Sequence, residues 1–165
     1  EYIDVVFPLT KEMDFEIIPT AGWTKEMADA RSNRLKEIRS DSLWKDQWQQ
    51  YIDANEKSDS VMNSYENRDD PYFINSKAYD DAAEIYLSVY NRLFNEELGA
   101  GGWDNINEAH YSYIEKALDL HSRKGKRILI TYGAGHKGWF LRALQKREDI
   151  RLIEVTPFLD DALKR

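Results

Sequence analysis

The chain has 165 residues, enough for one domain with a substantial hydrophobic core. Its 23 lysines and arginines against 30 aspartates and glutamates give a net charge of −7, which argues against nucleic acid as a partner because nucleic-acid binding requires a basic surface. The absence of cysteine excludes disulfides, thiolate nucleophiles and cysteine zinc sites, and no apolar run is long enough for membrane insertion.

The N-terminal residues carry a mixed pattern that leads into a first predicted strand. The chain begins at Glu1 without a methionine, so we expect a processed form or a fragment. Tyr2 to Phe7 is β-like in composition, whereas Pro8 and residues 9–13 fit a kinked helix. Phe15–Pro19 then predicts a strand.

Residues 24–122 are predicted to form a large helical insertion. Thr24 is a suitable N-cap for the first helix, and Gly99 with the glycines after it ends the longest one. Residues 57–75 are polar and turn-rich, which predicts a long loop with room for a short helical turn. The predicted helices cover residues 24–38, begin again near residue 42, and then span 76–98 and about 104–121.

Two further β-type segments follow, Arg127–Tyr132 and Arg151–Val155. The first is a nearly continuous apolar run, typical of a buried parallel strand, and residues 126–159 fit a strand, turn, helix, strand unit. We therefore predict a single α/β domain over residues 1–165, whose small and mainly parallel sheet is built from these segments and Phe15–Pro19. Three strands are few for such a sheet, so the alternative is the C-terminal part of a larger α/β domain.

The turn Gly133-Ala134-Gly135-His136, between the second predicted strand and a helix, is the most informative stretch. Glycines permit a sharp turn, and open α/β sheets bind their ligands where the strands end. The helix start lowers the pKa of His136 and favours neutral imidazole, which suits a metal ligand or a general base. Backbone N–H groups near Gly133 and Gly135 suit an anion. The alternative is a turn that needs its glycines for backbone conformation alone.

The other two histidines lie in the predicted helix 104–121. His121 is near its C-terminus, where a histidine complements the helix dipole, so we expect a structural role. His110 falls on the inward face, with Asn107 at the edge of that face. His110 is either a core residue or, because this helix directly precedes the strand that ends at Gly133, a part of the same site as Asn107.

Two arginines, Arg31 and Arg34, interrupt the apolar stripe of the predicted helix 24–38. Three interpretations are open: the arginines form internal ion pairs, their aliphatic stems cover the core, or they bind a substrate carboxylate or phosphate. Trp23 and Trp139 each follow a predicted turn at the end of a strand and are candidates for the wall of a pocket.

Motifs of several enzyme classes are missing. No serine occupies a G-x-S-x-G elbow, the usual site of the nucleophile in α/β-hydrolases. Gly133 and Gly135 lack the third glycine of the dinucleotide fingerprint, because Gly138 has the wrong spacing, and no Walker-type lysine is present. Nucleotide binding is therefore not expected.

Trp103 to Val155 resembles the C-terminal part of the TraB/GumN/Tiki-type superfamily, to which erythromycin-esterase-like and several bacterial domains are related. The resemblance is carried by Gly133–His136 and by the helix that contains Asn107. It implies a metal-dependent hydrolase with two Gly-x-x-His motifs, a divalent metal ion as cofactor, and His136 as metal ligand or base. The first such motif is absent, and Ile106 stands where the family usually has arginine.

These observations predict a hydrolase-like domain that is incomplete and inactive as this chain, because one histidine without an acid beside it cannot activate water through a metal. The predicted catalytic residues are His136, Asn107 and His110, with His136 also the metal ligand, and the predicted substrate or anion contacts are Arg31, Arg34, Gly133, Gly135 and Trp139. The expected ligand is a small molecule or a peptide. The alternative is a non-catalytic binding domain. The sequence leaves the compartment (cytoplasmic or exported) and the oligomeric state open.

Overall fold

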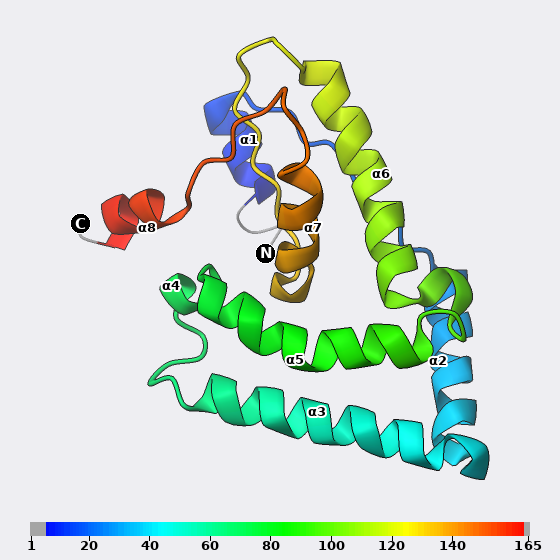
Figure 1. Cartoon of the computed structure of the whole chain (residues 1–165). Coiled ribbons are helices and arrows are strands. Elements are labelled where there is room, and N and C mark those ends of the chain that lie inside the picture. The colour runs from blue at the N-terminus through cyan, green and yellow to red at the C-terminus, as the bar shows by residue number, and fades with distance from the viewer. Residues whose placement is uncertain (1–5, 164–165) are drawn as a thin grey trace.

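A computed structural model describes residues 6–163 and shows a helical protein (Figure 1). Helices account for 69% of the structure, and residues 6–163 contain no strand, so the predicted α/β fold is wrong. None of the helices in this range has the length and apolar character that crossing a membrane requires. The α-helices are α1 (Phe7–Met13), α2 (Lys25–Ser40), α3 (Lys45–Asn63), α4 (Pro71–Ile74), α5 (Lys77–Phe94), α6 (Trp103–His121), α7 (Lys137–Leu144) and α8 (Thr156–Leu163).

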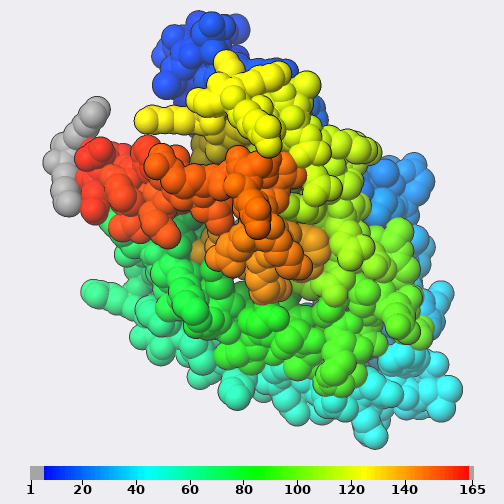
Figure 2. Space-filling view, turned by 45° about the horizontal axis from the view of Figure 1, so that its top comes forward, coloured from blue at the N-terminus to red at the C-terminus, as the bar shows by residue number. Residues whose placement is uncertain are grey.

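The body of the protein is an antiparallel pair, α3 and α5, to which α2 and α6 are joined at one end (Figure 1). Aromatic side chains of α3 pack on Phe94 of α5 and form one core cluster with Ile38 of α2. Helix α7 fills the angle between α5 and α6 (Figure 2), where Phe140 and Leu144 bury their side chains with Ile114 and Leu118 of α6.

Local signals account for the helix starts. The Thr24 side chain accepts a hydrogen bond from the Met27 N–H, so the predicted N-cap is confirmed. Ser76 caps α5 in the same way by accepting from the Tyr79 N–H. The predicted kinked helix over residues 9–13 is confirmed by α1, which begins at Phe7 with Pro8 in its first turn. The β-like interpretation of Tyr2 to Phe7 falls largely on residues 1–5, which lie outside the described range.

The predicted loop over residues 57–75 is wrong at its start, and the short helical turn expected within it is α4. Helix α3 continues to Asn63 and the short α4 begins at Pro71, which leaves residues 64–70 as the loop. Polar residues near the end of α3 misled the sequence interpretation, because one of them faces α5: Ser58 is buried, and its hydroxyl donates to the Ala82 carbonyl at 2.7 Å.

All three predicted strands, at 15–19, 127–132 and 151–155, are extended or irregular chain without strand pairing among the described residues. Residues 127–132 run beside α6 and α7 (Figure 1), and Ile130 and Tyr132 pack on the α6–α7 cluster while Leu129 is 84% exposed. A β-type composition fits a half-buried extended segment as well as a strand, because strand formation also requires a neighbour for the backbone.

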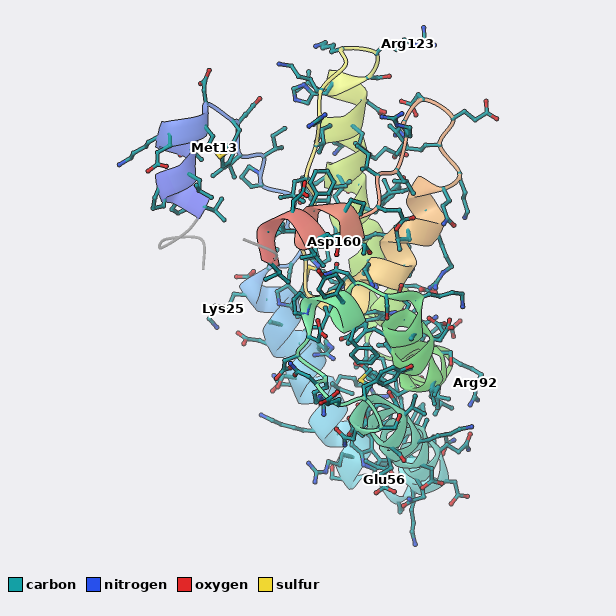
Figure 3. The ribbon with its side chains drawn as sticks, turned by 90° about the vertical axis from the view of Figure 1, so that its left-hand side faces the viewer. Met13, Lys25, Glu56, Arg92, Arg123 and Asp160 are labelled. Atoms are coloured by element: carbon teal, nitrogen blue, oxygen red, sulfur yellow. The ribbon has the colours of Figure 1, made fainter. Side chains whose placement is uncertain are left out.

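Since residues 6–163 form no sheet, the predicted subdivisions of the chain have to be described differently. Residues 24–122 are the body of the protein rather than an insertion into a sheet, and 126–159 is a helix between extended segments rather than a strand-helix-strand unit. Two short helices lie at the margin of this body, and α8 contacts α4, where the Tyr72 hydroxyl donates to the Asp160 carboxylate at 2.9 Å. Helix α1 has no buried residue, and Met13 at its end is 67% exposed (Figure 3); α8, which the sequence analysis did not predict, has none either.

Candidate functional site

A pocket of about 360 Å³ lies between α2, α5 and α6 and is closed by two extended segments, around Trp23 and around Gly133. This volume is within the range of small-molecule sites, roughly 300–1,000 Å³. The wall is mainly aromatic and contains both histidines that the sequence analysis assigned to a site. The lining residues are Trp23, Arg31, Tyr90, Gly101, Trp103, Ile106, His110, Tyr132, Gly133 and His136.

His136 is held in one tautomer by Asn107. The Asn107 side chain is fully buried, and its amide Nδ2 donates to the Trp103 carbonyl at 2.7 Å, which leaves Oδ1 as an acceptor. His136 Nδ1 lies 2.7 Å from this oxygen and must therefore be the protonated nitrogen. The lone pair of the neutral ring is then on Nε2. The ring also stacks on Trp103, with 4.9 Å between centroids.

His110 has the opposite tautomer. Its Nδ1 accepts a hydrogen bond from the backbone N–H of Gly22 at 2.8 Å, so the proton of the neutral ring is on Nε2. The His110 and His136 rings meet edge to face, with centroids 5.4 Å apart. The pocket wall therefore contains one imidazole that carries its lone pair on Nε2 beside one that carries its proton there.

Burial keeps both imidazoles neutral. It lowers the pKa of His136 to about 4, with a smaller contribution from nearby His110. Burial also lowers the pKa of His110, and the backbone carbonyl of Thr20 opposes this in part. Protonation of His110 at Nδ1 would also break its bond from Gly22.

Arg31 reaches the pocket from α2. Its Nε and Nη2 both donate to the Tyr90 hydroxyl, at 3.2 and 2.9 Å, and its stem packs against Gly101, where an added Cβ would lie 2.8 Å from the Arg31 Cβ. The side chain is part-buried, and no carboxylate in residues 6–163 forms an ion pair with it.

The segment that contains Trp23 forms one wall of the pocket and is bound tightly to α6. A Cβ at Gly22 would come within 2.5 Å of the Ala109 carbonyl carbon, so this close approach requires glycine. The Tyr132 hydroxyl lies 2.5 Å from the Thr20 carbonyl, which ties this wall to the one around Gly133.

Five of the predicted site residues meet at this pocket. Four of them line it (His136, His110, Arg31 and Gly133), and the fifth, Asn107, orients His136 from behind. Trp23 also lines the pocket, as its position after Pro19 indicated.

Three predicted site residues lie elsewhere. Gly135 and Trp139 face a separate crevice that has room for about one water, where Trp139 Nε1 donates to the Asp104 carboxylate at 3.0 Å. Arg34 lies near the surface of α2 and pairs with Glu37 and Glu97. His121 is outside the pocket, with Nε2 3.9 Å from the Glu16 carboxylate.

Five lining residues were not predicted from the sequence: Tyr90, Gly101, Trp103, Ile106 and Tyr132. Tyr90 lies on the buried face of α5, and only its contact with Arg31, 59 residues away in the sequence, makes it a site residue. An arginine on the inward face of a helix implies a buried partner, and this was the one available signal for Tyr90.

The described residues do not fit a metal centre at His136. Residues 6–163 contain no group of three or more His, Asp or Glu side chains placed to hold a metal ion. Asn107 and Gly22 also occupy one nitrogen of each histidine in the pocket. This range therefore holds no complete set of metal ligands around His136, and the role of His136 as a metal ligand stays a prediction.

Comparison with protein-family models, with curated proteins and with solved structures gives no match for this chain. The chemistry of the pocket is accordingly interpreted from its own geometry, and the resemblance to the TraB/GumN/Tiki-type superfamily stays a prediction.

Proposed function

We propose that the pocket is a hydrolase-type site for a small molecule, in which His136 is the general base. The observation that carries the proposal is the pair of opposed tautomers: His136 offers a lone pair at Nε2 and His110 offers a proton at Nε2, on one pocket wall. The sequence-based expectation of an inactive chain considered His136 without a partner, whereas the pocket places a second imidazole and a guanidinium with it.

The proposed reaction is ester hydrolysis. His136 Nε2 takes a proton from a water molecule as the water oxygen bonds to the carbonyl carbon of the ester. The resulting oxyanion accepts a hydrogen bond from His110 Nε2–H, a stabilisation that a preorganised donor in a partly desolvated pocket provides well. The carbonyl then re-forms, the bond to the leaving oxygen breaks, and His136 returns its proton to that oxygen. Asn107 keeps His136 in the required tautomer throughout.

Hydrolysis of p-nitrophenyl acetate by the full chain tests the proposal. We expect His136→Gln to lower kcat/KM by about 10²-fold, the usual contribution of a general base, and Asn107→Ala to lower it less. His121→Gln is the matched control, because His121 lies outside the pocket, and it should leave kcat/KM unchanged. If the His136 and His121 variants lose kcat/KM equally, the hydrolysis is the nonspecific reaction of any exposed imidazole, and the proposal is refuted.

A non-catalytic ligand-binding site is the second candidate. It is favoured by the His136 pKa of about 4, because an imidazole with so low a pKa has a weak affinity for the proton that it must accept. In that case the turnover of the unmodified chain does not exceed that of His136→Gln, whereas ligands still bind in the pocket.

A further inference from the structure

We propose that the ligand of this pocket is a small organic anion, a carboxylate or phosphate monoester on a flat apolar body, and that Arg31 binds its charged group. The inference rests on the proposed function in one respect, since it takes this pocket as the ligand site. It goes beyond that function by naming the class of ligand and the residue that selects it.

The Arg31 guanidinium is fixed before any ligand arrives. Gly101 leaves no space beside the stem, and the Tyr90 hydroxyl accepts from Nε and Nη2 along one edge of the guanidinium. The remaining N–H groups, those of Nη1 and the second one of Nη2, are those that can bind a ligand. A guanidinium that is already oriented loses little conformational freedom on binding, and its paired N–H groups match the oxygens of a carboxylate or phosphate.

The charge of Arg31 is not neutralised by the described part of the chain. No carboxylate of residues 6–163 pairs with it, whereas Arg34, one turn further along α2, pairs with Glu37 and Glu97. With both pocket histidines neutral, Arg31 is the only charged side chain that the described residues contribute to the pocket lining. A part-buried cation without a counter-ion favours an anion from solution.

The remaining wall determines the rest of the ligand. Trp23, Trp103 and Tyr132 present aromatic surface, and Ile106 is the aliphatic residue of the lining. Such a wall gains free energy by covering an apolar group and favours flat rings in particular. A free inorganic anion would leave this aromatic surface wet, so an anion that carries an aromatic or similar flat body fits the pocket better.

Binding of a matched set of probes to the full chain, measured by isothermal titration calorimetry, tests the inference. The set is phenylacetate, phenyl phosphate, the neutral phenylacetamide, acetate and inorganic phosphate. We expect one of the two aryl anions or both to bind at least about tenfold more tightly than phenylacetamide and the two ring-free anions. Equal binding of phenylacetate, phenyl phosphate and phenylacetamide, or no binding of any probe, would overturn the inference.

Variants then locate the anion. Arg31→Gln should abolish the preference for the aryl anions over phenylacetamide, and Tyr90→Phe should reduce it, because the guanidinium loses its anchor. Arg34→Gln removes a paired arginine of the same helix outside the pocket and should retain the full preference. Loss of the preference in Arg34→Gln, or its survival in Arg31→Gln, would refute the role of Arg31. If Arg31→Gln fails to fold, Tyr90→Phe and the probe set decide.

The outcome is independent of the hydrolase proposal. His136→Gln should lose ester turnover and still prefer the aryl anions over phenylacetamide, because Arg31 and its contact with Tyr90 are intact. Anion-selective binding without turnover therefore supports this inference and removes the catalytic proposal, and turnover without anion selectivity does the reverse.

Discussion

Acid should destabilise this protein through His136 in a way that a single substitution can isolate. Burial lowers the pKa of His136 from an ordinary value near 6.5 to about 4, so the unfolded chain takes up a proton in a pH range in which the folded protein does not. The contribution of neutral His136 to the free energy of unfolding is therefore complete above about pH 6.5. It is lost as the pH falls from about 6.5 to about 4. Burial of His110 acts in the same direction.

The size of the effect follows from the shift. A shift of about 2.5 pKa units corresponds to about 3 kcal/mol, since each unit is about 1.4 kcal/mol. The His136 ring is only part-buried, so water screens the unfavourable charge, and we expect about half of this value, roughly 1.5 kcal/mol.

Urea unfolding of the unmodified chain and of His136→Gln at about pH 7.5 and about pH 4.5 measures this contribution. Glutamine does not titrate, and the stability lost with the packing contacts of the His136 ring is the same at both pH values. The difference in unfolding free energy between the two proteins should therefore change by roughly 1–1.5 kcal/mol, with the variant losing less stability in acid. A difference that is equal at both pH values, or that moves the other way, would refute the claim that the folded protein holds His136 neutral.

Three further substitutions test other parts of the structure. Asn107→Ala removes a fully buried amide that binds both His136 and the Trp103 carbonyl, so thermal unfolding should show a loss of about 1–3 kcal/mol. Gly22→Ala should lower the unfolding free energy by about 1–3 kcal/mol or displace the pocket wall, because the new Cβ would clash with the Ala109 backbone. The control is Gly125→Asn, at an open turn with left-handed backbone, which should lower the unfolding free energy far less. Leu129→Lys should leave stability within about 0.5 kcal/mol, because the side chain is 84% exposed, and should lower the binding of the dye ANS; a large loss of stability would mean that Leu129 is covered in solution.

The helices were largely predictable because their signals are local. Thr24 and Ser76 cap helices by bonding to N–H groups three residues away, and the apolar stripes repeat within each helix. The start of α8 also had a local signal, Pro157 directly after Thr156, that the analysis did not use. The strands at 127–132 and 151–155 were mispredicted because β-type composition says nothing about whether a neighbouring strand exists.

The site was predictable in part for the same reason. Asn107, His110 and His136 carry polar groups at positions that face inward or end a turn, which the sequence shows directly. The mutual geometry of the site was hidden, because the contacts that build it join residues distant in sequence, such as Arg31 with Tyr90 and Gly22 with His110. Arg34 and Trp139 lie outside the pocket, and the sequence does not show this because their partners are distant in the chain: Glu97 in the turn after α5 and Asp104 on α6.

The bonds that close the pocket also bear on the order in which this protein assembles and opens. Gly22 and His110 are 88 residues apart, and Thr20 and Tyr132 are 112 apart, whereas Ser58 and Ala82, which join α3 to α5, are 24 apart. Because short loops close at a lower entropic cost, the α3–α5 hairpin can form early, and the pocket can form only after the N-terminal segment returns to α6. The same segment can then detach while the hairpin stays folded, at a fraction of the global unfolding free energy. The Gly22 amide should accordingly exchange with deuterium faster than the amides of α5, and a ligand in the pocket should slow that exchange.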